Sequence, residues 1–501
     1  MGNIEIYKIL GPEIFLGITT IGLLILGLEK FIGRNVLNKI ESRQSREISE
    51  GWRMKDILRI GIVLLMITLG LIYISGEGEL FGGSVINNEY TKVIKIVSLL
   101  GIIGVLGLSR GYIENKRIDR YEYVILVLFI GWGLLLLIGA GDFIVWYLAL
   151  EIISLSSYII AAFKIKNSYS LEAGLKYFVL GALATGIGLY GISRIYGSVG
   201  TINFKEVGEI MSINGIDEMN LWVMGQGIVF IIIGFGFKMA AAPLHSWAVD
   251  VYEGAPKMVS VLFMTVPKIG ILSVMLRVLF VSFEAVDEII RIVLMILGIV
   301  SVIWGTVCAL RQEKIKRFLA YSTVGHIGYI MFGLSMGSRV GVESVLIYMI
   351  IYMITSLNIW GVVMLGGGEM NYIVGLRGLW KRNSLLGGIV VVNVLSMVGL
   401  PPFAGFFAKL GIIKAAIERG GIYIIIAIIL VLIGVIGGYY YLRIIKIAIF
   451  EPSMERIEIM TGEGGIGIMI VLATTFMGIA CWGMNPWWIS GIIEKISWLC
   501  I

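Results

Sequence analysis

The sequence predicts an all-α integral membrane protein with about fourteen transmembrane helices. Of its 501 residues, 58% are hydrophobic and only 15% are charged, which is too little charge to cover the surface of a soluble protein of this length. Apolar runs of about 20 residues recur along the whole chain, and each is long enough to cross a bilayer. Lysines and arginines are concentrated in the connections between these runs.

The first three apolar runs, at 9–29, 57–75 and 93–109, are expected to form peripheral N-terminal helices. The first run has no basic region before it and no small-residue cleavage site, so we expect a retained helix rather than a signal peptide. The polar segment that follows, NKIESRQSREISEGWRMKD, is expected to be a solvated connection.

Five further runs predict a first group of helices, at 121–140, 143–162, 171–196, 220–245 and 255–281. The run at 220–245, the seventh of the chain, contains Lys238 and then Pro243. Proline lacks a backbone donor and its ring clashes with the preceding turn, so we expect the helix to break there. In lipid, such a break persists only inside a helix bundle or next to water.

A second group of five runs lies at 287–310, 318–336, 341–366, 384–416 and 421–447, and a last helix is predicted at 464–483. The run at 384–416 is too long for one straight helix and contains Pro401, Pro402 and then Lys409. The two broken runs are five apart and cross the membrane in opposite directions. We therefore predict two inverted five-helix repeats, at 121–281 and 287–447, within a single polytopic domain of residues 1–501, with function at the breaks.

The basic residues alternate from one connection to the next. The odd connections are rich in them, as in the ninth, which holds Arg311, Lys314, Lys316 and Arg317, whereas each even connection holds about one. This alternation places the odd connections on the negative side of the membrane and both termini on the positive side. The net charge of +6 is therefore a topology signal and not a sign of a nucleic-acid partner.

Four charged residues fall well inside the predicted helices or beside their breaks: Glu151, Lys238, Lys268 and Lys409. A charge at the centre of a membrane helix costs roughly 2.5 kcal/mol or more, so we interpret these four as functional. The alternative is a side chain that reaches the membrane surface, and we expect that for charges near span ends. These are Lys92, Glu122, Lys176, Lys257, Arg277 and Lys414.

The two histidines, His245 and His326, are candidates for proton relay. His245 directly follows the first predicted break, and His326 follows Tyr321, Ser322 and Thr323 on the tenth span. The alternative for each is a buried structural histidine. No cofactor-binding or metal site is expected, because neither the histidines nor the three cysteines have ligand spacing, and no haem, iron–sulfur or dinucleotide pattern occurs.

Together these residues predict a proton path. Burial favours the neutral form of a lysine and a nearby carboxylate favours the charged form, so we expect Glu151 to lie near Lys238 and to control its protonation. Lys238, Lys268, His326 and Lys409 would then form a water-linked chain across the bundle. The sequence supplies the residue types and not their separations.

Four segments carry a family resemblance: AGLKYFVLGAL, KMAAAPLHSWAVDVYEGAP, KIKRFLAYSTVGHIGYIMFGL and LSMVGLPPFAGFFAKL. In this order and spacing they resemble the subunit 2 family of respiratory complex I, the proton-pumping NADH:quinone oxidoreductase, whose bacterial members are called subunit N. The resemblance runs from about residue 13 to about residue 450. The sequence departs from the family pattern before and after DVYEGAP, at Val249 and at Lys257–Met258.

The resemblance implies a fourteen-helix antiporter-like fold and a proton channel that uses Glu151, Lys238, Lys268 and Lys409. It also implies neighbouring membrane-arm subunits, other antiporter-like subunits among them, in a lipid bilayer. NADH, FMN, iron–sulfur clusters and ubiquinone would belong to the complex and not to this chain. The alternatives are a cation/proton antiporter subunit of a multisubunit exchanger and a membrane scaffold that does not pump. Isoleucine richness favours the mitochondrial inner membrane, with the bacterial plasma membrane as the alternative.

Overall fold

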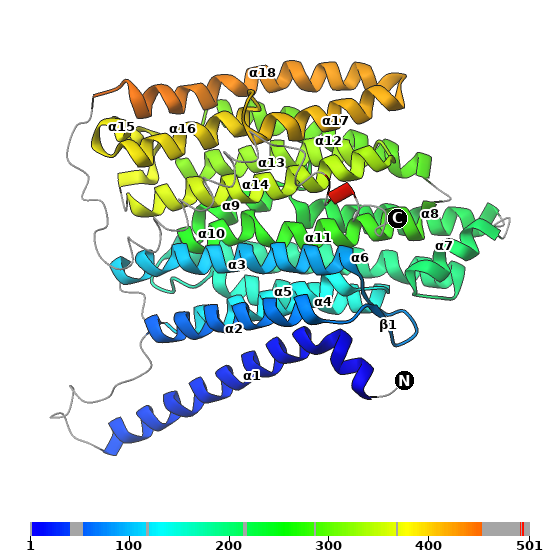
Figure 1. Ribbon diagram of the computed structural model, residues 1–501, viewed down its shortest axis with the longest axis horizontal. Helices are drawn as coiled ribbons and strands as arrows, with labels where there is room; N and C mark the ends of the chain where they lie inside the picture. The colour runs from blue at the N-terminus through cyan, green and yellow to red at the C-terminus, as the bar shows by residue number, and fades with distance from the viewer. Residues whose placement is uncertain are drawn as a thin grey trace.

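A computed structural model describes residues 3–40, 54–116, 120–213, 218–284, 287–366, 369–452, 491 and 493–494. Almost all of these residues are helical, and the helices lie side by side in one bundle, from α1 at one edge to α18 at the other (Figure 1). The N-terminus, the strands and α7 lie at the same end of the bundle (Figure 1). This end carries the even connections and is therefore the predicted positive side.

The N-terminal part consists of three long helices and a short hairpin. Its elements are α1 (Asn3–Ile40), α2 (Met54–Ile74), β1 (Gly78–Leu80), β2 (Val85–Asn87) and α3 (Glu89–Lys116). The strands are antiparallel, with Gly78 opposite Asn87. The hairpin was not predicted, because its strands of three residues are too short to give a periodic signal.

The described residues of the first predicted repeat, 121–213 and 218–281, form eight helices and one π-helical turn that ends just beyond them. They are α4 (Glu122–Gly139), α5 (Phe143–Ala161), α6 (Ser168–Val199), α7 (Phe204–Ile213), α8 (Glu218–Met239), α9 (Ser246–Gly254), α10 (Lys257–Met264), α11 (Val266–Arg277) and η1 (Val278–Ser282). The Asp142 side chain starts α5 by accepting a hydrogen bond from the Val145 amide at 2.6 Å. Helix α7 lies in a connection for which no helix was predicted.

The second predicted repeat contains six helices longer than one turn. Its elements are α12 (Asp287–Leu310), α13 (Ile315–Leu334), α14 (Arg339–Leu365), η3 (Glu369–Asn371), η4 (Ile373–Leu376), α15 (Leu379–Arg382), α16 (Ser384–Val398), α17 (Ala404–Arg419) and α18 (Ile422–Ile449). Ser338 and Asn383 cap α14 and α16 by accepting hydrogen bonds from backbone amides.

The all-α membrane fold is confirmed. Eleven helices in the described ranges are long and apolar enough to cross a membrane. Two more predicted spans correspond to α13, which carries histidine and basic residues, and to the broken pair α16–α17. The predicted span at 464–483 lies outside the described residues.

Helices pair in the same way in both predicted repeats. In the first, α4 packs on α5, α6 on both α8 and α9, and α4 on α11; in the second, α12 packs on α13, α14 on both α16 and α17, and α12 on α18. This is the pairing that an internal repeat would produce. The division into repeats at 121–281 and 287–447 stays a prediction.

Helices α12 and α13 approach closely because glycines face each other along their contact. A Cβ added at Gly328 would lie 2.6 Å from the Val302 nitrogen and 2.7 Å from the Gly298 oxygen. Small residues let helix backbones meet in this way in membranes, where van der Waals packing drives helix association.

We predict that Gly328→Val destabilises the protein by about 1–3 kcal/mol, because the new side chain has to displace the α12 backbone. The measurement is the thermal unfolding midpoint of the purified protein. Gly325→Ala on the same helix is the matched control, since a Cβ there has no neighbour within 4 Å. Equal midpoints for the two variants would contradict the prediction.

Candidate functional site

The first predicted break is confirmed, and Lys238 lies beside it. Helix α8 ends at Met239, α9 begins at Ser246, and Pro243 lies between them. Lys238 is buried, and its Nζ donates a hydrogen bond to Ser154 Oγ on α5 at 2.7 Å. The Tyr158 ring lies 5.9 Å from the same ammonium group.

Glu151 lies on α5, three residues before Ser154 and close enough to Lys238 for their charges to interact. Within the described residues, Lys238 bonds to Ser154 and forms no direct ion pair with Glu151. Ser154 is thus an additional member of this group. It was missed in the sequence because a serine in an apolar helix gives no distinctive signal.

Lys268 lies beside a third helix break. The span predicted at 255–281 is confirmed as one buried span, Lys257–Ser282, but an interruption within it was not predicted. Helix α10 ends at Met264 and α11 begins at Val266, with Thr265 at φ −114° and ψ −83° between them. Pro267, near the start of α11, was the signal that could have indicated this break.

The environment of Lys268 is enclosed by protein. Helices α10 and α11 are buried along their whole length, and Lys268 itself is only 1% exposed. Its Nζ has no hydrogen-bond partner among the described residues. The centroid of the Tyr252 ring lies 5.9 Å from the same nitrogen.

The second predicted break is also confirmed. Helix α16 ends at Val398 and α17 begins at Ala404, so Pro401 and Pro402 lie in the gap. Lys409 reaches back across this gap and donates hydrogen bonds to the carbonyl oxygens of Val398 at 2.7 Å and Met397 at 3.2 Å. The ring of Tyr329 lies 5.0 Å from the same ammonium group.

His326 is buried on α13 and is held by two tyrosines. Its Nδ1 lies 2.7 Å from Tyr348 Oη, and its Nε2 lies 3.0 Å from Tyr441 Oη. His326 and Lys409 line the same small cavity. The structure therefore brings His326 together with Lys409.

His245 lies apart from this pair. It is buried at the start of α9, with the rings of Trp304 and Tyr321 at 5.8 and 6.3 Å. Within the described residues, His245 forms no hydrogen bond or ring contact with His326, Glu151 or the three site lysines. It stays a candidate relay residue by position alone.

Two basic residues that were expected to reach the membrane surface do not. Lys257 is buried and donates hydrogen bonds to the carbonyls of Val363 and Met370. Arg277 is buried and donates to the carbonyls of Ile138 and Ala140. Both expectations were wrong because a neighbouring helix end offers carbonyl acceptors that cannot be located from sequence.

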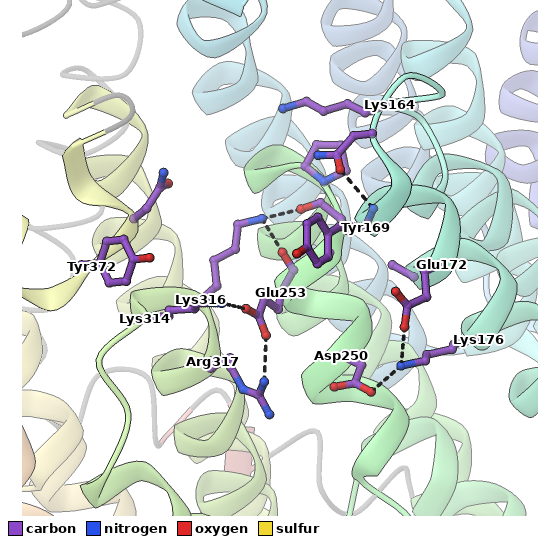
Figure 2. A pocket seen from close by; sticks show the side chains of 16 residues that line it. Lys164, Tyr169, Glu172, Lys176, Asp250, Glu253, Lys314, Lys316, Arg317 and Tyr372 are labelled. Atoms are coloured by element: carbon purple, nitrogen blue, oxygen red, sulfur yellow. Dashed lines mark hydrogen bonds and ion pairs between the residues drawn. The ribbon is translucent and has the colours of Figure 1, made fainter.

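A polar pocket of about 540 Å³ opens at the predicted negative-side end, between α6, α9 and α13 (Figure 2). Lys314 and Arg317 bond the Glu253 carboxylate at 2.7 and 3.1 Å. Lys176 lies between Glu172 and Asp250, at 2.8 and 2.9 Å. The hydrogen bond and charge of Glu253 raise the pKa of Lys314, so this lysine stays charged.

Taken together, the site consists of three lysines, each near a helix break and against an aromatic ring, and of the buried imidazole of His326 in the interior of α13. Groups of this kind can gain and lose protons, and hydroxyl groups lie beside several of them. The arrangement can therefore pass protons, provided that water joins its members.

Comparison with known proteins identifies the family of the chain. Residues 140–434 match the family described as NADH:quinone oxidoreductase/Mrp antiporter, TM. NADH-quinone oxidoreductase subunit N 1 of Rhizobium meliloti is 37% identical over 83% of this chain and 87% of the relative. Subunit N of Paramagnetospirillum magneticum is 35% identical over 93% of this chain and 94% of the relative.

Solved structures share the fold over nearly the whole chain. A chain of respiratory complex I from Thermus thermophilus with bound aureothin has a TM-score of 0.77 and 26% identity, with 96% of this chain and 98% of that chain covered. A chain of the Mrp complex from Dietzia sp. DQ12-45-1b also has a TM-score of 0.77, at 17% identity, with 99% and 97% covered, which shows the fold alone. The chain therefore belongs to the NADH-quinone oxidoreductase subunit N family, within the antiporter-like membrane subunits of complex I.

Proposed function

We propose that this chain translocates protons in an NADH:quinone oxidoreductase, through Glu151, Lys238, Lys268, His326 and Lys409. The observation that carries this proposal is Lys268, a lysine enclosed in the bundle at a helix break with no hydrogen-bond partner among the described residues. A structural lysine would be expected to have acceptors. A lysine that alternates between charged and neutral forms needs only a polarisable neighbour, such as the ring of Tyr252, and access to water.

Protons would enter from the negative side through the pocket that Glu253, Lys314 and Lys316 line. They would reach Lys238, whose protonation Glu151 controls. At an effective dielectric constant of about 20, moving a carboxylate from about 4 to about 8 Å from an ammonium group changes their interaction by about 2 kcal/mol. This exceeds a tenfold change in proton affinity, so a small movement of α5 relative to α8 would suffice to switch Lys238.

The second half of the path would run from Lys268 to His326 and Lys409. Tyr348 and Tyr441 bind both ring nitrogens of His326, so they fix the orientation of the imidazole and can exchange protons with it. NADH oxidation and quinone reduction would take place in other subunits, and movement of charge there would drive the switch at Lys238. His245 is a further relay candidate.

The type of membrane and the neighbouring subunits are inferred from the relatives. We propose that the chain is surrounded by other membrane-arm subunits, antiporter-like subunits included. The relatives described above are bacterial, which supports the bacterial plasma membrane over the mitochondrial inner membrane that composition favoured. The exchanger alternative is less well supported, because the Mrp chain shares 17% identity and the complex I chain 26%.

We predict that Lys268→Met leaves the complex assembled but lowers the protons translocated per NADH oxidised in reconstituted vesicles. Lys268→Arg should not restore pumping, because a guanidinium group does not release its proton at usable pH. Lys414→Met, at an exposed lysine of α17, is the matched control. Full pumping by an assembled Lys268→Met complex would show that Lys268 is a structural charge and not part of the path, and would contradict the proposal.

We also predict that the double variant Tyr348→Phe/Tyr441→Phe lowers pumping more than it lowers stability. It removes three hydrogen bonds, two to His326 and one between Tyr441 and Ser322, each worth about 1 kcal/mol to stability, and it leaves His326 without its proton-exchange partners. Pumping and the thermal midpoint are measured on the same preparation. Tyr439→Phe is the control on the same helix, because Tyr439 is 66% exposed. A loss of stability with unchanged pumping would contradict the prediction.

A further inference from the structure

The small cavity between His326 and Lys409, which we call the lysine cavity, is surrounded by polar side chains. Its volume is about 10 Å³, which is about the least space that one water molecule needs. Besides His326 and Lys409, its lining includes four residues with hydroxyl groups, namely Tyr348, Tyr352, Thr355 and Ser396. A buried water needs about two to four polar partners, and these side chains can supply them.

A second cavity, also of about 10 Å³, lies nearer the negative side and is apolar. Its lining extends from Ile315, in the first turn of α13, to Tyr441 of α18, and includes Phe318, Val390 and Val394. Tyr441 has the one polar side chain among the described residues that line it. This apolar cavity stays dry, because a water inside it would lack the partners that it needs.

Hydrogen bonds lead from the lysine cavity to the apolar cavity. Tyr348 Oη lies 2.7 Å from His326 Nδ1, and Tyr441 Oη lies 3.0 Å from His326 Nε2. Tyr441 Oη also forms a hydrogen bond with Ser322 Oγ. Each hydroxyl group can donate one hydrogen while it accepts another, so a proton can pass along this series without leaving a charge on it. Proton exchange at His326 therefore extends as far as Ser322.

The apolar cavity separates Ser322 from the polar pocket at the negative side. Lys314 and Lys316 line that pocket, whereas Ile315, between them in the sequence, lines the apolar cavity. Ser322 lies about two turns further along α13, a rise of about 10 Å. An apolar constriction closes a channel because water leaves it. Protons at Ser322 are thus about 10 Å of dry protein away from the pocket.

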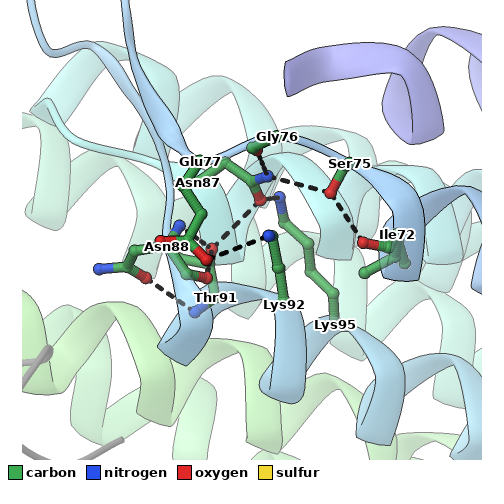
Figure 3. Close-up of polar contacts among 9 residues, drawn as sticks. All are labelled: Ile72, Ser75, Gly76, Glu77, Asn87, Asn88, Thr91, Lys92 and Lys95. Atoms are coloured by element: carbon green, nitrogen blue, oxygen red, sulfur yellow. Dashed lines mark hydrogen bonds and ion pairs between the residues drawn. The ribbon is translucent and has the colours of Figure 1, made fainter. Parts of the chain in front are cut away.

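Such a barrier matters at Lys409 more than at other buried lysines. Lys95 of α3 lies 2.6 Å from the Glu13 carboxylate of α1, and neither residue is more than 2% exposed. Its Nζ also donates to Asn87 Oδ1 at 3.0 Å (Figure 3). Loss of a proton from Lys95 would leave a buried carboxylate unpaired, which is costly. Lys409 donates to neutral carbonyls, so it can lose its proton without that cost.

We propose that the apolar cavity is a seal that closes the second half of the proton path toward the negative side. This inference rests on the function proposed above, because a seal is needed only where protons are exchanged. While the cavity is dry, a proton at Lys409 or His326 can reach Ser322 and go no further. It leaves toward the positive side only, so the seal prevents protons from flowing back to the side from which they came.

Val390→Thr/Val394→Thr is the deciding variant in the reconstituted complex. Both valines line the apolar cavity, and neither is more than 2% exposed. Together with Tyr441, the two new hydroxyl groups would give a water about three polar partners. After an imposed pH step, without NADH, we expect vesicles with this variant to conduct protons at least about tenfold faster, because hydration opens an apolar constriction.

The matched control is Val391→Thr/Val392→Thr, which makes the same two substitutions on the same helix at residues that line neither cavity. Vesicles with this control should be as tight to protons as those with the unmodified complex.

Tyr441→Phe, added to the double threonine variant, identifies the route of the leak. It removes the hydroxyl group that joins His326 to Ser322, so the proton conductance should return to that of the unmodified complex. Lys268→Met in the same background should leave the leak unchanged, because Lys268 precedes His326 on the proposed path.

The outcomes separate the seal from the proposed function. Tight vesicles with an assembled double threonine variant overturn the seal, and so does a leak that Tyr441→Phe does not stop. If the double variant fails to assemble, Val394→Thr alone is measured in the same way, and tight vesicles then overturn the seal. Pumping by Lys268→Met decides on the proposed function separately, because the leak is measured without NADH.

Discussion

The rest of the structure depends on one constraint, that backbone groups at a helix break must find partners, and Lys409 meets it by donating hydrogen bonds to the carbonyls of Met397 and Val398. Inside a bilayer, a backbone group released by a broken helix has to find a partner within the protein. At the first break the same requirement is met differently, since Ser301 Oγ accepts from the Ala242 amide and Trp247 Nε1 donates to the Phe237 carbonyl. At both of these breaks a polar side chain forms a hydrogen bond with the exposed backbone, so the breaks place polar groups inside the bundle.

The lysines at these breaks are accompanied by aromatic rings more than by carboxylates. Tyr158, Tyr252 and Tyr329 lie 5.0–5.9 Å from the ammonium groups of Lys238, Lys268 and Lys409. A ring face attracts an ammonium group by about 0.5–2 kcal/mol but carries no net charge. When the lysine loses its proton, no buried anion is left unpaired. Rings therefore permit a change of protonation that a close ion pair would oppose, and Glu151 can act on Lys238 without holding it.

Sequence reasoning located the parts of the site that depend on local chemistry. Pro243 and the Pro401–Pro402 pair break their helices because a missing donor and a ring clash act locally. The break at Thr265 was missed. Pro267 lies in the first turn of α11, where proline is tolerated, so its presence alone did not indicate that the preceding helix ends.

The partners of the buried groups could not be predicted, because they depend on how distant helices pack. Tyr348 and Tyr441 bind His326 from two other helices, 22 and 115 residues away in sequence. Lys257 and Arg277 were misplaced for the same reason. An apolar segment with one basic residue has the same sequence pattern whether that residue reaches the membrane surface or donates hydrogen bonds to the carbonyl groups at the end of another helix.

The ion pair between α1 and α3 has a consequence for how the chain enters the membrane. Glu13 is 2% exposed and lies 2.6 Å from Lys95. Lys95 is synthesised about 80 residues later, which at about 5–20 residues per second is a delay of about 4–16 s. During that interval α1 carries an acidic side chain whose partner does not yet exist. An unpartnered charge is costly in lipid. The N-terminal helix is therefore expected to settle at its buried position only when α3 arrives beside it.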